Sequence, residues 1–200
     1  MKATKFLSIV FCCLAAVSVT SCLGDDSKDN NALTDQEKAQ CLAVVKGDYT
    51  GKLVYPTTET KDGKAVSDTI DAKWSIASDN KLIIKAFPTR LLAEHVTDST
   101  VKEALASAND IDIECYIGFI NVSPVQYLIN PQTPSYTVNY GDKEHKIQVP
   151  FLASNYYSFG SYDQTQNLME MQIIEAGLYI DGQLTDYLTT SIPFAFYSKK

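Results

Sequence analysis

Residues 69–76 read Thr-Ile-Asp-Ala-Lys-Trp-Ser-Ile, and apolar and polar side chains alternate along the stretch. Successive side chains of a β-strand point to opposite faces of its sheet. One face of this segment therefore carries Ile70, Ala72, Trp74 and Ile76, and the other face is polar. Such alternation is typical of an antiparallel strand with one buried face, and it predicts a β-rich fold.

The segments on either side of this strand have the same period of two. Residues 49–55 and 81–87 alternate in the same way, and polar stretches that contain Asp62-Gly63 and residues 78–80 separate them from residues 69–76. Both polar stretches hold residue types that favour turns. We expect three consecutive strands joined as a meander.

A helix is expected before these strands. Thr34 and Glu37 have the spacing of a capping box, in which each side chain bonds the backbone N–H of the other residue. Apolar residues follow at helical spacing, and Gly47 is a suitable stop. The pattern predicts one amphipathic helix of about three turns.

Two short helices are expected in the middle of the chain. Pro88 ends the third strand, and residues 89–96 and 99–108 have helical patterns. In the second of these, Thr100 and Glu103 again have capping-box spacing.

The rest of the chain returns to a period of two. Further strands are expected within residues 111–122, 136–140, 145–151, 168–176, 178–180 and 192–196. In the first of these both faces are apolar from Tyr116 onward, so we expect its second half to be buried on both sides. The sequence as a whole predicts a mainly β (α+β) fold, in which about eight or nine strands form an antiparallel barrel-like or sandwich sheet.

The first 21 residues have the features of a signal peptide. Met1–Lys5 is basic, and residues 6–19 are apolar but too short to span a bilayer. The sequence Val19-Thr-Ser-Cys22 resembles the lipobox of bacterial lipoproteins, which implies cleavage before Cys22 and lipidation of its thiol. An ordinary secretory signal with an incidental cysteine is the alternative.

Residues 22–33 lack apolar side chains that could form a core, so we expect a flexible acidic tether before a single domain over residues 34–200. Asp25 and Asp26 resemble the acidic export signal of surface lipoproteins in the Bacteroidota, although any polar tether contains acids. The lipid on Cys22 would hold the protein to the outer membrane, at the cell surface or on the periplasmic face.

Composition excludes several classes of function. The chain of 200 residues has 17 Lys and Arg against 24 Asp and Glu, a formal charge of −7, and loss of Lys2 and Lys5 with the signal peptide lowers the charge to −9. An acidic protein lacks the basic surface that general nucleic-acid binding needs, so we expect no nucleic-acid partner. With two histidines in the whole chain, no His-rich metal site can form, and we expect no metal and no cofactor.

No catalytic motif occurs in the sequence. HExxH, GxSxG, the P-loop and GxGxxG are all absent, and His95 and His145 both lie among apolar residues. A nucleophile–histidine–acid triad assembled in space stays open, but we name no catalytic residue. Cys41 and Cys115 lie at apolar positions, which favours two separate buried thiols over a disulfide.

The strongest candidate for a binding site is an aromatic cluster. Residues 156–162 read Tyr-Tyr-Ser-Phe-Gly-Ser-Tyr and place Tyr156, Tyr157, Phe159 and Tyr162 close together in the chain. Exposed aromatic rings are typical of sugar-binding surfaces, because they offer a flat apolar face and a hydroxyl group. In a strand Tyr156 and Tyr157 would point to opposite faces, and ordinary sheet packing is the alternative.

Four segments together resemble a family of uncharacterised Bacteroidota lipoproteins that carry one domain of unknown function. These segments are residues 47–53, 115–131, 156–162 and 171–177. The resemblance implies a single-domain lipoprotein and assigns no reaction.

The leading hypothesis is a cell-envelope lipoprotein, anchored through Cys22, that binds a glycan or a small amphiphile without catalysis. The first alternative is a structural or assembly partner in an envelope protein complex. A hydrolase is the third hypothesis.

Overall fold

The fold is that of a computed structural model, which describes residues 32–154 and 156–199. The expected signal peptide, the lipidation site Cys22 and the tether up to residue 31 lie outside the described residues. Within the described part, no helix is both long enough and apolar enough to cross a membrane.

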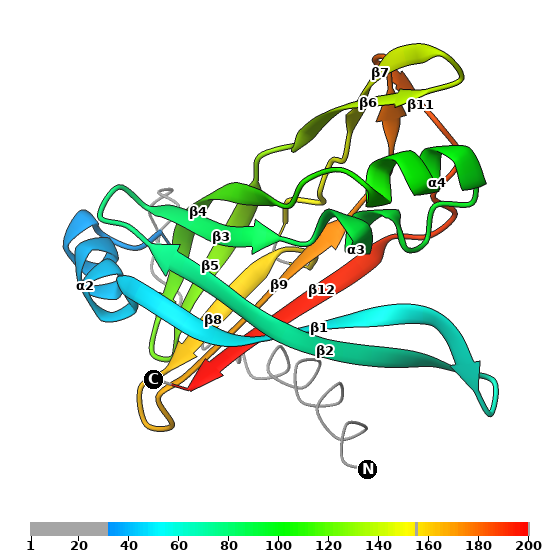
Figure 1. The fold of residues 1–200 in the computed structure, drawn as a ribbon. Helices are drawn as coiled ribbons and strands as arrows, with labels where there is room; N and C mark the ends of the chain where they lie inside the picture. Colours follow the sequence, from blue (N-terminus) through cyan, green and yellow to red (C-terminus); the bar gives the residue numbers. More distant parts are fainter. Residues whose placement is uncertain (1–31, 155, 200) are drawn as a thin grey trace, which may run out of the picture.

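Eight strands form a closed antiparallel barrel in the order β1-β12-β9-β8-β5-β4-β3-β2 (Figure 1). Pairing of Lys52–Val54 with residues 195–197 closes the barrel between β1 and β12. The eight strands are β1 (Gly47–Lys61), β2 (Lys64–Ile76), β3 (Lys81–Phe87), β4 (Ile111–Val122), β5 (Val125–Pro131), β8 (Phe159–Asp163), β9 (Leu168–Glu175) and β12 (Ile192–Lys199). The expected mainly β, barrel-like fold is confirmed, and the initial meander is β1-β2-β3.

A second sheet of four short strands has the order β11-β10-β7-β6. Its strands are β6 (Ser135–Tyr140), β7 (Lys143–Gln148), β10 (Tyr179–Ile180) and β11 (Gln183–Leu184). It lies at one end of the barrel, next to α4, and α2 lies at the opposite end (Figure 1). The sequence did not separate these strands from those of the barrel.

Within the described residues, three helices accompany the two sheets: α2 (Asp35–Val45), α3 (Thr89–Ala93) and α4 (Ser99–Ala106). The capping box of α2 is confirmed, because the Glu37 N–H donates to Thr34 Oγ1 and the Thr34 N–H donates to Glu37 Oε2. The cap expected for α4 is wrong. Asp98 accepts the Val101 N–H at 2.9 Å, so the helix starts at Ser99 and Thr100 lies inside its first turn.

Aromatic rings fill much of the barrel interior. The Trp74 ring stacks on Tyr49 with 5.7 Å between centroids and meets Phe196 edge-on at 5.9 Å. Glycine makes room for these rings. A β-carbon at Gly51 would overlap the backbone carbonyl of Tyr197 and lie 2.7 Å from the Trp74 ring, and one at Gly160 would overlap the ring of the fully buried Tyr127.

The outer side of β4 corrects one expectation from the sequence. Tyr116 and Ile120 are 49% and 45% exposed, so the second half of β4 is not buried on both sides. A strand of a closed barrel has one face toward the interior, which here takes Ile117 and Phe119, and its other face points outward.

Candidate functional site

The barrel wall opens between β2 and β3. These strands pair from Ile76 and Leu82 as far as Lys73 and Lys85, where the ladder ends. The next residue of β3, Ala86, has a positive φ of 46°, and its N–H donates to Asp112 on β4 at 2.8 Å. Positive φ is uncommon for a residue with a side chain and turns the backbone sharply. This turn directs β3 toward β4 while β2 continues alongside β1.

A cavity of about 280 Å³ occupies this opening, and we call it the wall slot. Four large apolar side chains, two alanines and a proline form most of its lining: Leu53, Ile84, Phe87, Phe196, Ala72, Ala86 and Pro88. Thr50, Asp71, Lys73 and Lys85 are its polar lining residues. A mostly apolar concavity with few polar groups is the usual form of a small-ligand site, and mouths of β-barrels are a frequent place for one.

The charges at the wall slot are of two kinds. Asp71 is paired, because Lys52 Nζ lies 2.6 Å from its carboxylate, and the hydrogen bond between them lowers the pKa of Asp71 and raises that of Lys52. Lys73 and Lys85 are exposed and form no ion pair within the described part of the chain. The wall slot therefore combines an apolar interior with two unpaired positive charges.

The structure divides the aromatic cluster predicted from the sequence. Tyr156 and Tyr157 are 75% and 45% exposed, in a turn where the N–H groups of Tyr157 and Ser158 both donate to Ser154 O. They do not point to opposite faces of a strand as expected, because β8 begins only at Phe159. Tyr162 is buried, and its hydroxyl lies 3.2 Å from Asn167 Oδ1.

Phe159 is half-buried and belongs to an apolar area outside the barrel. Its Cα partner is Leu128 on β5, and the partner of Leu128 is Gly118, between Tyr116 and Ile120 on β4. We call Tyr116, Ile120, Leu128, Tyr157 and Phe159 the outer aromatic face. Sequence reasoning missed Tyr116 and Ile120 as members, although the apolar outer positions of residues 116–120 were the available signal.

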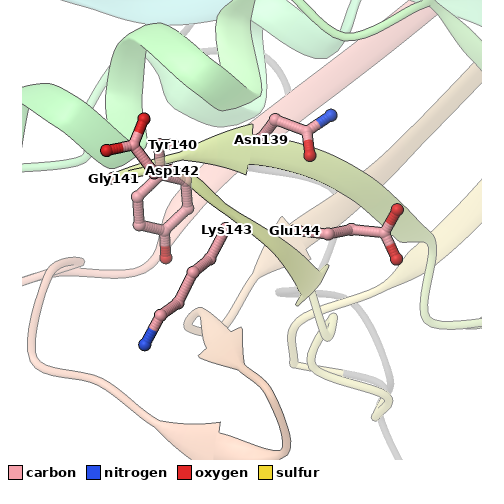
Figure 2. A pocket seen from close by; sticks show the side chains of 6 residues that line it. All are labelled: Asn139, Tyr140, Gly141, Asp142, Lys143 and Glu144. Carbon is pink, nitrogen blue, oxygen red and sulfur yellow. The ribbon is translucent and has the colours of Figure 1, made fainter.

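A second hollow lies beside the turn between β6 and β7 (Figure 2). Its lining is the run of six consecutive residues 139–144, whose side chains point in different directions. Next to it, the Tyr140 ring stacks on His145 at 4.0 Å, and His145 Nδ1 lies 2.8 Å from Asp181 Oδ2. A single hairpin does not converge polar groups on one point, so we assign no site here.

The side chains most suited to catalysis lie apart from one another. His95 Nε2 is 3.0 Å from the Pro56 carbonyl, and among the described residues no nucleophilic side chain bonds either histidine. Cys41 and Cys115 are free and buried, which confirms the prediction of two separate thiols. Burial raises the pKa of Cys41, and that of Cys115 to about 12. Residues 32–154 and 156–199 hold no group of three or more metal-ligating side chains.

Glu175, the last residue of β9, is a buried acid that the sequence patterns did not single out. It is fully buried, and neither carboxylate oxygen has a hydrogen-bond partner within the described residues. Burial raises its pKa well above the usual value, which favours the neutral acid. Its signal in the sequence was its position, since it continues the inward series of Met169, Met171 and Ile173.

Comparison with known proteins places residues 44–180 in a family described as a domain of unknown function, DUF4840. No curated protein is significantly similar. The crystal structure of the ywiB protein from Bacillus subtilis is similar over 79% of this chain and 97% of its own, at 7% identity and a TM-score of 0.31. A sequence identity and a TM-score this low support no conclusion about this chain. Because the matched region is more than half of its length, the chain belongs to the DUF4840 family.

Proposed function

We propose that this protein is a lipid-anchored cell-envelope protein whose barrel binds a small amphiphile without catalysis. The wall slot is the observation that supports this proposal best. Ala72, Ala86 and Pro88 offer accessible apolar surface for a hydrocarbon tail, above a floor of Leu53, Ile84, Phe87 and Phe196 that is only about 1% exposed. The charged edge of the wall slot lies at the protein surface, where a polar head group would stay in water.

The envelope location rests on the first 22 residues. A basic start, a short apolar run and the lipobox-like Val19–Cys22 support cleavage and lipidation at Cys22. The acidic tether supports a bacterial surface lipoprotein of the Bacteroidota type, held at the outer membrane. Mass spectrometry of the native protein should find an acylated amino-terminal Cys22, and an uncut, unmodified Met1 form would contradict this part of the proposal.

Ligand binding can be followed through Trp74, the only tryptophan in the chain. Trp74 meets Phe196 edge-on, and Phe196 lines the wall slot. We expect octyl glucoside, below its micelle concentration, to change Trp74 emission saturably.

The matched variants are Ala72→Leu and Ala65→Leu, both on β2. Ala72 lines the wall slot, whereas Ala65 is exposed near the β1–β2 turn. Ala72→Leu should abolish the response and Ala65→Leu should keep it, with both variants folded by circular dichroism. A response that is absent in the wild type, or that survives Ala72→Leu, would overturn binding in the wall slot.

Glycan binding at the outer aromatic face is the second candidate. The exposure of Tyr116 and Tyr157 on this face, and of Tyr156 next to Tyr157 in the chain, favours it, because exposed tyrosine rings can stack on sugars. A glycan array should then give a hit that Tyr156→Ala and Tyr157→Ala abolish without unfolding the domain. Co-purification of an envelope protein through this face, with no glycan hit, would instead support a structural or assembly partner.

A further inference from the structure

We infer that the wall slot selects single-chain amphiphiles with an anionic head group, which Lys73 and Lys85 hold at its edge. This inference rests on the proposed ligand-binding function and adds the chemical class of the ligand. It commits to a short carboxylate such as octanoate.

The first argument is the placement of the two lysines. Lys73 and Lys85 are Cα partners across β2 and β3, at the last pair before the strands separate. Like charges directly opposite each other destabilise a sheet, and neither lysine has an ion pair among the described residues. A bound anion between them would offset the repulsion.

The second argument is the charge balance around the opening. Among the charged residues that line the wall slot, the one acid, Asp71, is already bonded to Lys52. Asp112 on β4 accepts the N–H of the lining residue Ala86, so three lysines (Lys52, Lys73 and Lys85) face two acids at this edge, and the net charge there is positive in a chain whose formal charge is −7. A cationic head group would meet two like charges, whereas a carboxylate would meet two opposite ones.

The third argument is the size of the cavity. At about 280 Å³ it is slightly smaller than common ligand pockets, which range over roughly 300–1,000 Å³. This volume suits one short chain better than the two long chains of a membrane lipid. A free single-chain carboxylate is therefore the occupant that fits both the size and the charge.

The test compares three probes with the same seven-carbon tail: octanoate, heptyl glucoside and heptylamine. Titrations followed by Trp74 emission and by calorimetry should show octanoate binding about fivefold more tightly than heptyl glucoside, as two exposed ion pairs would provide, and heptylamine more weakly. The preference for octanoate should fall as salt is added, since salt screens exposed charges.

The chain offers a matched control for the lysines. Lys61 and Lys64 are also cross-strand partners, but they lie at the β1–β2 turn, away from the wall slot. Lys73→Gln with Lys85→Gln should remove the preference for octanoate, and Lys61→Gln with Lys64→Gln should keep it.

Two contrary results are distinguishable. Equal affinity for octanoate and heptyl glucoside would overturn the anionic preference while the proposed binding function stands. No binding of any of the three probes would overturn both.

Discussion

Small residues have opposite consequences in two parts of the barrel, the interior beside Gly160 and the wall slot beside Ala72. At Gly160 the missing side chain is replaced by the Tyr127 ring, which is fully buried and whose hydroxyl donates to Met169 Sδ. At Ala72 a cavity of about 280 Å³ remains between β2 and β3, with Phe87 and Phe196 among its lining residues. Small residues thus allow close packing in one part of the barrel and leave room in another.

The difference comes from the strand ladders. β5, β8 and β9 pair continuously around Gly160, so that inward side chains meet across the barrel. β2 and β3 separate after Lys73 and Lys85, so Ala72 and Ala86, the residues beyond that pair, are not paired across the two strands. The wall slot lies where the β2–β3 ladder ends.

The largest effect is expected from Gly160→Ala. The added methyl group must displace the Tyr127 ring in a closely packed interior, so we expect a loss of about 3 kcal/mol in the free energy of unfolding. Urea denaturation would measure it. Gly118→Ala is the control, because a β-carbon there meets open space on the outside of β4 and should change stability by less than about 0.5 kcal/mol. Equal effects of the two variants would contradict the packed interior.

Glu175 tests whether the packed region tolerates a charge. Burial raises its folded-state pKa, so the unfolded chain loses its proton first as the pH rises. The contribution of the neutral Glu175 side chain to the free energy of unfolding is fully present below about pH 4.5. As the pH rises from there toward the folded-state pKa, this contribution falls by at most about 1.4 kcal/mol per pH unit.

Glu175→Met should remove this part of the pH dependence and stabilise the protein by about 1–3 kcal/mol at pH 8, since it replaces an unpaired buried acid with an apolar side chain of similar length. Denaturation measured between pH 4 and pH 8 would check both effects. A variant that is less stable than the wild type at pH 8 would show that the carboxylate has a partner.

Ala72→Leu tests whether the space in the wall slot is present in solution. The larger side chain enters existing space, so we expect a change of less than about 1 kcal/mol in stability, in contrast to Gly160→Ala. Thermal denaturation of both variants would test the contrast. A loss as large as that of Gly160→Ala would mean that the space is not available in solution.

The smallest effect is expected when the native protein is treated with a thiol reagent. Cys41 and Cys115 are buried, and burial raises the pKa of both thiols, so a thiol reagent at pH 8 should leave them unmodified in the native protein. Urea should expose both residues to the reagent. Rapid modification of Cys115 in the native state would show that the barrel interior opens to water.

Local patterns in the sequence predicted much of the fold. Alternation in residues 69–76 predicted β2, and the Thr34–Glu37 spacing predicted the start of α2, because each depends on neighbouring residues alone. The exposure of Tyr116 was not predictable in this way, because it depends on closure of the barrel by β1 and β12, which lie far from β4 in sequence.

The candidate site was less accessible to sequence reasoning. The wall slot depends on the positive φ of Ala86, and alanine gives no signal of such a turn as a glycine or an asparagine would. The division of the aromatic cluster depends on where β8 begins, and a shift of a few residues decides whether Tyr156 and Tyr157 lie in a strand or in a turn.

The central claim, that the barrel binds an amphiphile between β2 and β3, can be tested most directly with a brominated ligand. A crystal structure of the protein with 8-bromooctanoate should show an anomalous bromine peak among Leu53, Phe87 and Phe196, with the carboxylate near Lys73 and Lys85. A well-occupied bromine on the outer aromatic face, or a wall slot that stays empty at saturating ligand, would contradict the claim.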